Sequence, residues 1–320
     1  MQAVAVREFG AVPAVLELPL PTPGAGEVRV RMEGAGINPF DWKIADGVLK
    51  GSRPHVFPLI LGVDGAGTID AVGPGVARFR VGDRVFGQFL HDPVGRGTYA
   101  ESALVPESKA IGRIPSSISS WEASALPTSG MTALEALDRL GLSSGKSLVV
   151  VGASGGIGSF AVPLAADAGV RVIAVARSSS HERLRSIGAT ETIDPSSPEP
   201  QAALRAIRPA GIDGLLDLVS DAPTFARWAA TVRPGGIAAT TVHAAGPVAG
   251  VRTVNIDLEP RSELLERLAA LVAGGRIRVP MERVIDLSAA PAAVVEGRAG
   301  RLSGKTVIRL DPRGETAPSA

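Results

Sequence analysis

The chain has 320 residues, is 45% hydrophobic and carries a formal net charge of +1, so it can bury one large core or two moderate ones and offers no charge-based case for binding nucleic acid or an anionic membrane. It contains no cysteine, which excludes disulfides, thiol nucleophiles and zinc sites built on thiolates. It shows neither an uninterrupted run of 18 apolar residues nor the pattern of a signal peptide. We therefore expect a soluble, cytoplasmic protein.

The first part of the chain, residues 1–118, shows short β-like runs separated by glycine and proline. Such spacing of short strands and turn signals predicts a compact, mostly β unit. The clearest runs are Val28–Met32, Gly67–Val72, Asp83–Phe86 and Tyr99–Val105.

From about Ser119 the pattern changes to an alternation of helices and strands. Strands separated by helical stretches of 10–15 residues are typical of βαβ units around a parallel sheet. The predicted helices are Trp121–Ala125, Met131–Leu140, Ile157–Ala168, His181–Ile187 and Thr224–Thr231. The predicted strands are Ser147–Val151, Val170–Ala176, Thr190–Ile193, Gly214–Leu218 and Gly236–Thr241.

Past about Arg252 the chain predicts one strong helix, Glu263–Ala273, and two further β-like runs, Arg283–Leu287 and Thr306–Leu310. The closing segment, residues 311–320, is rich in small and polar residues, and we predict that it is a mobile tail.

A glycine-rich loop follows the predicted strand Ser147–Val151 and opens the next helix. Glycines in such a loop let backbone N–H groups approach an anion closely, and the positive end of the helix dipole faces that anion. In this context of strand, loop, helix and second strand, we predict that the loop binds the pyrophosphate of a dinucleotide. The predicted contacts are Gly152, Ala153, Ser154, Gly155, Gly156 and Ile157.

The end of the next strand indicates which dinucleotide is bound. Sites that prefer NAD usually place a carboxylate there for the ribose 2′-hydroxyl, but this strand is followed by Arg177 and Ser178. Both side chains are suited to hold a 2′-phosphate by charge-assisted hydrogen bonds. We therefore predict NADPH as the cofactor; in the alternative interpretation Arg177 is only a solvated loop arginine.

Seven motifs occur in an order that resembles one known family from residue 1 to about 310. They are GINPFDWKIADG (Gly36–Gly47), the glycine-punctuated segment Leu61–Gly87, GTYAE (Gly97–Glu101), LPTSGMTALEAL (Leu126–Leu137), VGASGGIG (Val151–Gly158), VRPGG (Val232–Gly236) and GKTVIRL (Gly304–Leu310). With these motifs the chain resembles the zinc-independent quinone oxidoreductases (ζ-crystallin-like) of the medium-chain dehydrogenase/reductase superfamily.

The resemblance implies a domain organisation that explains why the glycine loop lies almost halfway along the chain. In this family a nucleotide-binding domain is inserted into a GroES-like β domain, which resumes after it. The resemblance therefore implies an α/β chain with a GroES-like, β-rich catalytic domain at residues 1–118 and 253–320. A parallel, doubly wound Rossmann domain for NADPH would occupy residues 119–252, and the family leads us to expect a homodimer.

Three departures from the zinc-dependent relatives argue against a metal. Those relatives have a cysteine in the segment that is Asn38–Trp42 here, and Gly-His-Glu where this chain has Gly62-Val63-Asp64. They also carry a structural zinc lobe with four cysteines, which this chain lacks. We therefore predict no metal and, in place of Lewis-acid alcohol oxidation, hydride transfer to a quinone or to a C=C conjugated with a carbonyl.

The predicted catalytic residues are Asn38, Asp41 and Lys43. By resemblance, Asn38 lies beside the nicotinamide and the substrate carbonyl, although a residue before Pro39 also suits a plain turn. Asp41 either orders the same loop or takes part in proton transfer. Lys43 is the nearest ionisable candidate for a general acid; it equally fits a solvated charge, with water as the proton source.

Further cofactor contacts are implied by the resemblance. Thr241, Val242 and His243 follow the strand Gly236–Thr241, in the segment that contacts the nicotinamide in the family. The segment PTSGMT similarly places Thr128 and Thr132 near the cofactor, although Thr132 also suits a helix residue or cap.

Three other residues were assigned from their motifs. Lys305, in GKTV, is predicted to reach the cofactor from the part of the catalytic domain that follows the insertion. Tyr99 is predicted to pack in the core, and Asp64 to brace the glycine-punctuated segment.

The predicted function is NADPH-dependent, metal-free reduction of a quinone or of the C=C of an α,β-unsaturated carbonyl compound. One alternative is a pathway-specific enoyl reductase that tailors a polyketide-like intermediate. Another, from a different class, is a catalytically silent NADPH-binding sensor or scaffold. The expected partner is accordingly a small quinone or enone, with neither nucleic acid nor membrane.

Overall fold

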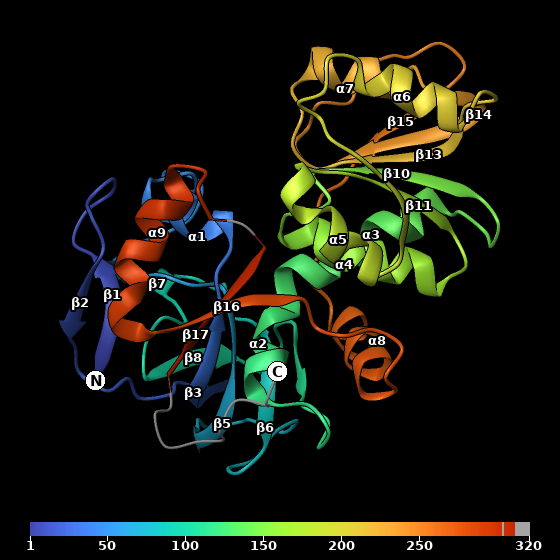
Figure 1. Ribbon diagram of the computed structural model, residues 1–320. Coiled ribbons are helices and arrows are strands. Elements are labelled where there is room, and N and C mark those ends of the chain that lie inside the picture. The colour runs from blue at the N-terminus through green and yellow to red at the C-terminus, as the bar shows by residue number, and fades with distance from the viewer. Residues whose placement is uncertain (303, 311–320) are drawn as a thin grey trace. The chain divides into compact units, whose positions relative to one another are not determined.

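The computed structural model describes residues 1–302 and 304–310, and its helices and strands form two compact units (Figure 1). The first unit contains Met1–Thr128, Pro260–Gly275 and the described residues from Val279 onward, and the second contains Ser129–Glu259 and Arg276–Arg278. The chain thus leaves the first unit, builds the second and returns, which confirms the predicted insertion of one domain into another. The predicted tail, residues 311–320, lies outside the described residues.

The first unit is built on two β-sheets. Its larger sheet has the strand order β16-β17-β3-β5-β6-β9, with β8 also paired to β3, and its smaller sheet has the order β2-β1-β4-β7. The strands are β1 (Gln2–Val6), β2 (Ala14–Glu17), β3 (Glu27–Gly36), β4 (His55–Ile60), β5 (Asp64–Val72), β6 (Arg84–Gln88), β7 (Val94–Arg96), β8 (Ser102–Pro106), β9 (Ile111–Arg113), β16 (Met281–Asp286) and β17 (Lys305–Arg309).

The longest strand of this unit shows why its sequence forms a half-buried sheet. Along β3, Val28, Val30 and Met32 are buried, whereas Arg29 and Arg31 between them are more exposed. This alternation follows from the two-residue period of side chains along a strand. The buried face belongs to a hydrophobic core that also contains Tyr99, which confirms the predicted packing role of that tyrosine.

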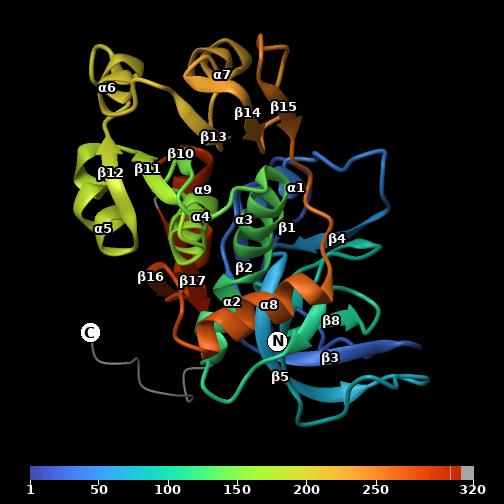
Figure 2. The ribbon, with the colours of Figure 1, turned by 90° about the vertical axis from the view of Figure 1, so that its right-hand side faces the viewer.

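In the part of the chain that the structure describes, four α-helices belong wholly to the first unit: α1 (Pro39–Ala45), α2 (Ser120–Ala125), α8 (Ser262–Ala273) and α9 (Ala290–Arg298). Figure 2 shows α2 close to β3 and β5, against which it packs. Trp121 and Ala125 of α2 form a small cluster with Val307 of β17. Because of this packing the first unit extends to Thr128, whereas the sequence analysis placed its boundary at residue 118.

The second unit is a parallel sheet with the strand order β12-β11-β10-β13-β14-β15. Numbered along the chain this is the order 3-2-1-4-5-6 of dinucleotide-binding folds, in which the order reverses between the first and fourth strands. The strands are β10 (Ser147–Val151), β11 (Arg171–Val175), β12 (Ala189–Ile193), β13 (Ile212–Asp217), β14 (Val232–Thr240) and β15 (Arg252–Asn255).

Helices cover both faces of this sheet (Figure 1). The helices α4 (Gly156–Asp167) and α5 (His181–Ser186) lie on one side, and α6 (Pro200–Ile207) and α7 (Ala222–Ala229) lie on the other. The central strand β10 is buried along its whole length, as a strand covered on both faces must be. The remaining helix, α3 (Pro127–Leu140), begins at the last residues of the first unit and continues into the second.

No helix within the described residues is both long enough and apolar enough to cross a lipid bilayer.

Candidate functional site

Only glycine fits at two positions here, one in the loop between β10 and α4 and one in the first turn of α4. Gly152 has a φ of +79°, and a Cβ there would lie 2.7 Å from Cγ1 of Val219. At Gly158 a Cβ would lie 2.6 Å from Cα of Ala153, so this glycine lets α4 pack directly on the loop. The loop therefore brings its backbone to the amino end of α4, the geometry that suits a bound anion.

Helix α5 contributes an arginine to this loop that the sequence analysis did not single out. The guanidinium of Arg183 donates from Nη2 to the carbonyl of Ser154 and from Nη1 to Oγ of Ser159, both at 3.3 Å. Arg183 is half-buried. Its charge therefore lies beside the predicted pyrophosphate loop, a position that depends on tertiary packing and leaves no signal in the spacing of the motif.

The turn after β11 carries the two residues predicted to hold a 2′-phosphate. Arg177 is exposed, and the backbone N–H of Ser178 donates to Oδ2 of Asp194 at 2.8 Å. The Asp194 carboxylate also accepts bonds from Oγ and N–H of Ser196, and these bonds with that of Ser178 lower its pKa to about 2. The negative charge of Asp194, just after β12, thus lies next to Ser178. The sequence of β11 and its turn does not indicate this charge.

The segment after β14 carries the predicted nicotinamide contacts. Thr241 donates its backbone N–H to the carbonyl of Asp217 at 3.3 Å, which places it at the carboxyl edge of the sheet. His243 adopts a φ of 57°, rare for a residue with a side chain. Its Nε2 lies 3.0 Å from Oδ1 of Asp257 and its side chain is 61% exposed. Val242 is exposed beside it, and all three residues stay predicted contacts.

The predicted nucleotide contacts of the second unit lie at one edge of its sheet, because the carboxyl ends of parallel strands meet at the same edge. The loops after β10, β11 and β14 all leave from the carboxyl ends of their strands, where ligands of such folds bind. Thr132 is different, because it lies within α3 and is only 6% exposed.

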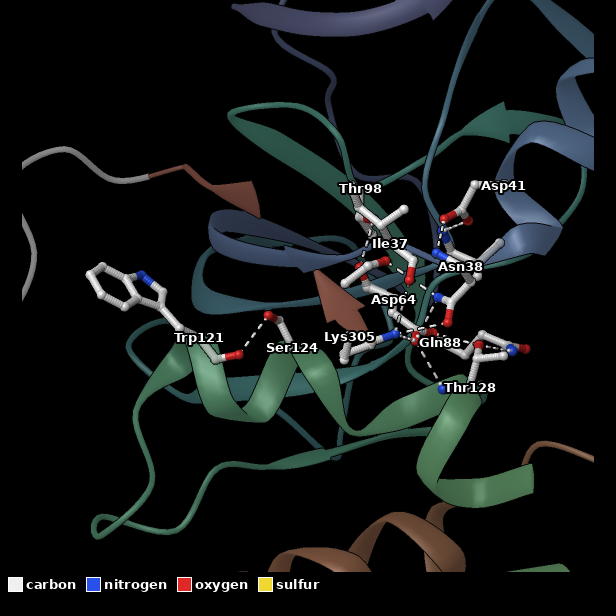
Figure 3. Close-up of polar contacts among 12 residues, drawn as sticks. Ile37, Asn38, Asp41, Asp64, Gln88, Thr98, Trp121, Ser124, Thr128 and Lys305 are labelled. Carbon is white, nitrogen blue, oxygen red and sulfur yellow. Dashed lines mark hydrogen bonds and ion pairs between the residues drawn. The ribbon is translucent and has the colours of Figure 1, made fainter. Parts of the chain in front are cut away.

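A second cluster of polar side chains lies inside the first unit (Figure 3). Its members come from five places in the sequence: Asn38 just before α1, Asp41 in the first turn of α1, Asp64 at the start of β5, Thr128 in the first turn of α3 and Lys305 at the start of β17. Asn38, Asp41, Asp64 and Lys305 are each no more than 1% exposed.

Asp64 lies at the centre of this cluster. Its carboxylate accepts hydrogen bonds from Nδ2 of Asn38 at 2.9 Å, from N–H of Thr128 at 2.9 Å and from Oγ1 of Thr128 at 2.6 Å. The ammonium of Lys305 lies 3.5 Å from its Oδ2. Asp64 thus does more than brace a glycine-rich segment, because it joins the start of α3 to β17 and to the loop before α1.

Lys305, which is predicted to reach the cofactor, lies inside the buried cluster of the first unit. Its Nζ donates to Oδ1 of Asn38 at 2.8 Å and to the carbonyl of Ile37 at 3.3 Å, besides its ion pair with Asp64. A Cβ at Gly36 would lie 3.0 Å from this Nζ. Buried carboxylate, amide and carbonyl oxygens thus hold the ammonium within the first unit, and the cofactor contact of Lys305 stays a prediction.

The predicted catalytic residues of the α1 segment differ in their environments. Asn38 uses its amide internally, since Nδ2 donates to the carbonyl of Gly36 at 3.3 Å as well as to Asp64. Lys43 is exposed on α1, outside the buried cluster. Their assignment to catalysis stays a prediction, and in this conformation the amide of Asn38 serves the cluster.

Asp41 accepts three hydrogen bonds in a fully buried position. The donors are N–H of Asn38 at 2.7 Å, N–H of Val63 at 3.0 Å and the hydroxyl of Tyr99 at 2.5 Å. Burial nevertheless raises the pKa of Asp41 to about 7, against the lowering effect of the bonds from Tyr99 and Asn38. Burial and the neighbouring Asp41 carboxyl raise the pKa of Tyr99 well above its usual value.

Asp64 and Lys305 shift in opposite directions for the same reason. Burial raises the pKa of Asp64, and the ammonium of Lys305 opposes this shift. Burial lowers the pKa of Lys305, and the carboxylate of Asp64 opposes that shift. Moving one proton from Lys305 to Asp64 converts the ion pair into a neutral pair. Both pKa shifts reduce the free-energy difference between these two states.

Within the residues that the structure describes, no group of three or more His, Asp or Glu side chains is placed to hold a metal ion. The second unit has a glycine loop with an adjacent arginine, a geometry that suits an anion, and the first unit has a buried set of titratable groups.

Two family models match the chain in the order of its units. Residues 24–116 match the alcohol dehydrogenase GroES-like domain, and residues 156–258 match the model described as zinc-binding dehydrogenase. Together these matches define the class: a medium-chain dehydrogenase/reductase, composed of a GroES-like and a nucleotide-binding domain.

Relatives that match nearly the full chain identify the family within this class. The chloroplast envelope quinone oxidoreductase homolog of Arabidopsis thaliana is 32% identical, and the match covers 96% of this chain and 98% of the relative. The 2-methylene-furan-3-one reductase of Solanum lycopersicum is 29% identical over 98% of this chain and 80% of its own. The quinone oxidoreductase of Pseudomonas syringae pv. Tomato DC3000 superposes with a TM-score of 0.83 at 26% identity, covering 96% of this chain and 99% of that one. The chain belongs to the zinc-independent quinone oxidoreductase family.

Proposed function

We propose that the chain is an NADPH-dependent, metal-free reductase that transfers hydride to a quinone or to the C=C of an α,β-unsaturated carbonyl compound. The observation that carries the proposal is the loop between β10 and α4, with the guanidinium of Arg183 bonded to its Ser154 carbonyl. The family supports it, because relatives named as a quinone oxidoreductase homolog and as a methylene-furanone reductase span nearly the whole chain.

The residues of the second unit fit a dinucleotide. Gly152 and Gly158 leave room for the loop to fold against α4, so backbone N–H groups at the amino end of α4 can hold a pyrophosphate. Arg177 is exposed on the turn after β11 and can extend to a 2′-phosphate, while Arg183 adds positive charge at the loop. Thr241 and Val242 would orient the nicotinamide. A reduced nicotinamide, when bound, supplies the hydride for this reaction.

The test is a fluorescence titration of the purified protein with NADPH and with NADH. NADPH should bind more than about tenfold tighter, which corresponds to about 1.4 kcal/mol. Arg177→Ala should remove most of that difference and leave NADH binding unchanged. If neither nucleotide binds, the glycine loop serves another purpose and the proposal fails.

The same preparation separates the enzyme from a silent nucleotide-binding protein. NADPH oxidation is followed at 340 nm with 1,4-benzoquinone and with 3-buten-2-one as acceptors. Turnover of either acceptor supports the reductase, and broad turnover of simple acceptors argues against a pathway-specific enoyl reductase. Tight binding of NADPH without oxidation by any acceptor would instead indicate a sensor or scaffold.

A further inference from the structure

The buried cluster of the first unit lowers the stability of the fold, because charged groups are removed from water. It holds the carboxyls of Asp41 and Asp64 and the ammonium of Lys305, all almost completely removed from water. Taking such charges out of water costs several kcal/mol per ion, and apolar side chains of similar size often replace them without loss of stability. Clusters of buried ionisable groups with shifted pKa values are therefore candidates for acid–base chemistry.

The cluster has a definite order from inside to outside. The ammonium of Lys305 lies 3.5 Å from Oδ2 of Asp64, and Oδ1 of Asp64 lies 2.6 Å from Oγ1 of Thr128. Nε2 of Gln88 donates to the same Thr128 hydroxyl oxygen at 2.9 Å. Lys305 and Asp64 are completely buried, whereas Thr128 and Gln88 are partly exposed. A proton held between Lys305 and Asp64 thus has a hydrogen-bonded route outward through Thr128 (Figure 3).

The Thr128 hydroxyl can pass on a proton because one oxygen both accepts and donates. In the structure it donates to Asp64 and accepts from Gln88. When Asp64 carries the proton, the hydroxyl can rotate, accept from Asp64 and donate outward. The hydroxyl alone is too weak an acid to protonate an enolate, so its proton must be replaced as it leaves, and Asp64 is placed to replace it.

We propose that Lys305, Asp64 and Thr128 form a proton relay that ends at the hydroxyl of Thr128 and delivers the proton of the reduction; this inference rests on the proposed function. Hydride adds to the β-carbon of the enone, and the π electrons move to the carbonyl oxygen to give an enolate. The O–H bond of Thr128 breaks as a new C–H bond forms at the α-carbon. As this proton leaves, Nζ of Lys305 gives a proton to the Asp64 carboxylate and Asp64 passes one on to Thr128, so that Lys305 ends neutral and Asp64 ionised.

The relay is reset from solvent after the product leaves. Neutral Lys305 regains a proton through Asp64 and Thr128 in the reverse direction, so one hydride and one proton are consumed per enone reduced. Oδ1 of Asn38 and the carbonyl of Ile37 hold Nζ in place throughout. Asp41, hydrogen-bonded to Tyr99, forms a separate branch; the Asp64 carboxyl raises its pKa, and Asp41 in turn raises that of Lys305.

In this scheme Thr128 is the catalytic residue, and Asp64 and Lys305 act through it. The relay matters most for carbon protonation, because the oxygens of a reduced quinone take protons readily from water. The test therefore compares 3-buten-2-one with 1,4-benzoquinone, in water and in D2O, for wild type, Thr128→Val, Thr128→Ser and Lys305→Met. Thr98→Val is the matched control, since its hydroxyl donates to the backbone carbonyl of Asp64 and lies outside the relay.

Thr128→Val should lower kcat for 3-buten-2-one by about tenfold to a thousandfold, in the range of general acid catalysis. Its D2O effect should exceed that of wild type, and its quinone reduction should fall less than its enone reduction. Thr128→Ser should restore the enone rate, and Lys305→Met should resemble Thr128→Val. NADPH titration and far-UV circular dichroism of each variant show whether it is folded.

Two results would overturn the relay while leaving the reductase intact. One is an enone rate for Thr128→Val within twofold of that for Thr98→Val, with an unchanged D2O effect. The other is equal loss with both acceptors together with weaker NADPH binding, because Thr128 would then position the cofactor. Failure of the wild type to oxidise NADPH with either acceptor is a separate outcome, and it overturns the proposed function and the relay together.

Discussion

At the scale of single residues, Asp41 shows how burial and hydrogen bonding compete for one carboxyl group. Three donors favour its ionised form: N–H of Asn38, N–H of Val63 and the hydroxyl of Tyr99. Removal from water favours the protonated form, and the nearby Asp64 carboxyl acts in the same direction. Burial wins, because the pKa rises from 3.8 to about 7.

The raised pKa of Asp41 predicts that the protein loses stability as pH increases toward neutrality. Between pH 3.8 and about 7 the folded chain holds a proton on Asp41 that the unfolded chain releases. The unfolded state then binds fewer protons, so the free energy of unfolding falls with pH over this window, by an upper bound of about 4 kcal/mol for this group. Asp64, with its raised pKa, acts in the same direction, and Lys305, with its lowered pKa, acts in the opposite direction at higher pH. Urea denaturation at pH 5 and pH 8 measures the difference.

Asp41→Asn tests the assignment, because it mimics the protonated carboxyl at every pH. The variant should show a much smaller fall in unfolding free energy between pH 5 and pH 8. Asp194→Asn is the control: the pKa of Asp194 is lowered to about 2, so the stability that it contributes is lost only in acid, below this window. A wild-type protein equally stable at both pH values would contradict the prediction.

The residues whose surroundings could not be predicted from the sequence are those whose partners come from distant segments. Lys305 stands 241 positions after Asp64 in the chain. A lysine in a GKTV motif carries no sign that a carboxylate from another strand will cover it. Asn38 is similar, since the partners of its amide include Asp64 and Lys305. The motifs identified the right segments, and tertiary packing decided where the side chains point.

At the scale of elements, the arginines of α5 point in different directions and contact different elements. Arg183 donates to the glycine loop at Ser154 and to Ser159 of α4. Arg185, two residues on and on another face of the helix, donates from Nη2 to Oγ1 of Thr192 in β12 at 2.6 Å. Arg177 lies before the helix and is exposed. These three arginines should therefore contribute differently to nucleotide binding.

We predict that Arg183→Ala weakens NADPH and NADH alike, by about tenfold, because it removes positive charge near the pyrophosphate and releases the Ser154 carbonyl. Arg177→Ala should weaken NADPH selectively, since only NADPH carries the 2′-phosphate. Arg185→Ala, from the same helix, should leave both affinities within about twofold of wild type. Fluorescence titration of the three variants with both nucleotides distinguishes these patterns. A selective loss of NADPH binding in Arg183→Ala would assign the 2′-phosphate to Arg183 in place of the pyrophosphate.

Elements with a strong period were predictable from the sequence, and short or atypical ones were not. The strands β10, β11 and β13 and the helix α8 follow from apolar runs and helical spacing, and they lie where the patterns indicated. The helix α9 was missed because its segment, APAAVVEGR, begins with small residues and a proline. The strand β2 was missed because it is largely exposed, so its sequence lacks the alternation of apolar and polar residues that marks a half-buried strand.

At the scale of the whole molecule, the insertion gives each unit its own core and its own tryptophans. Trp228 is 2% exposed in the core of the second unit, which also contains Phe225 and Leu215. Trp121 packs with Val307 in the first unit, and Trp42 lies against the core of the same unit. These are the three tryptophans of the chain, so tryptophan variants can report on each unit by itself.

We predict that NADPH stabilises the second unit selectively. In a variant that keeps only Trp228, with Trp42→Phe and Trp121→Phe, NADPH at a hundred times its Kd should raise the unfolding free energy by about 2.7 kcal/mol. In the complementary variant, Trp228→Phe, the tryptophan signal reports the first unit and should respond less to NADPH but more to pH, because Asp41 lies there. Urea titrations followed by fluorescence compare the two. Identical midpoints and identical NADPH responses in both variants would show that the chain unfolds as one cooperative unit, and selective stabilisation would then be wrong.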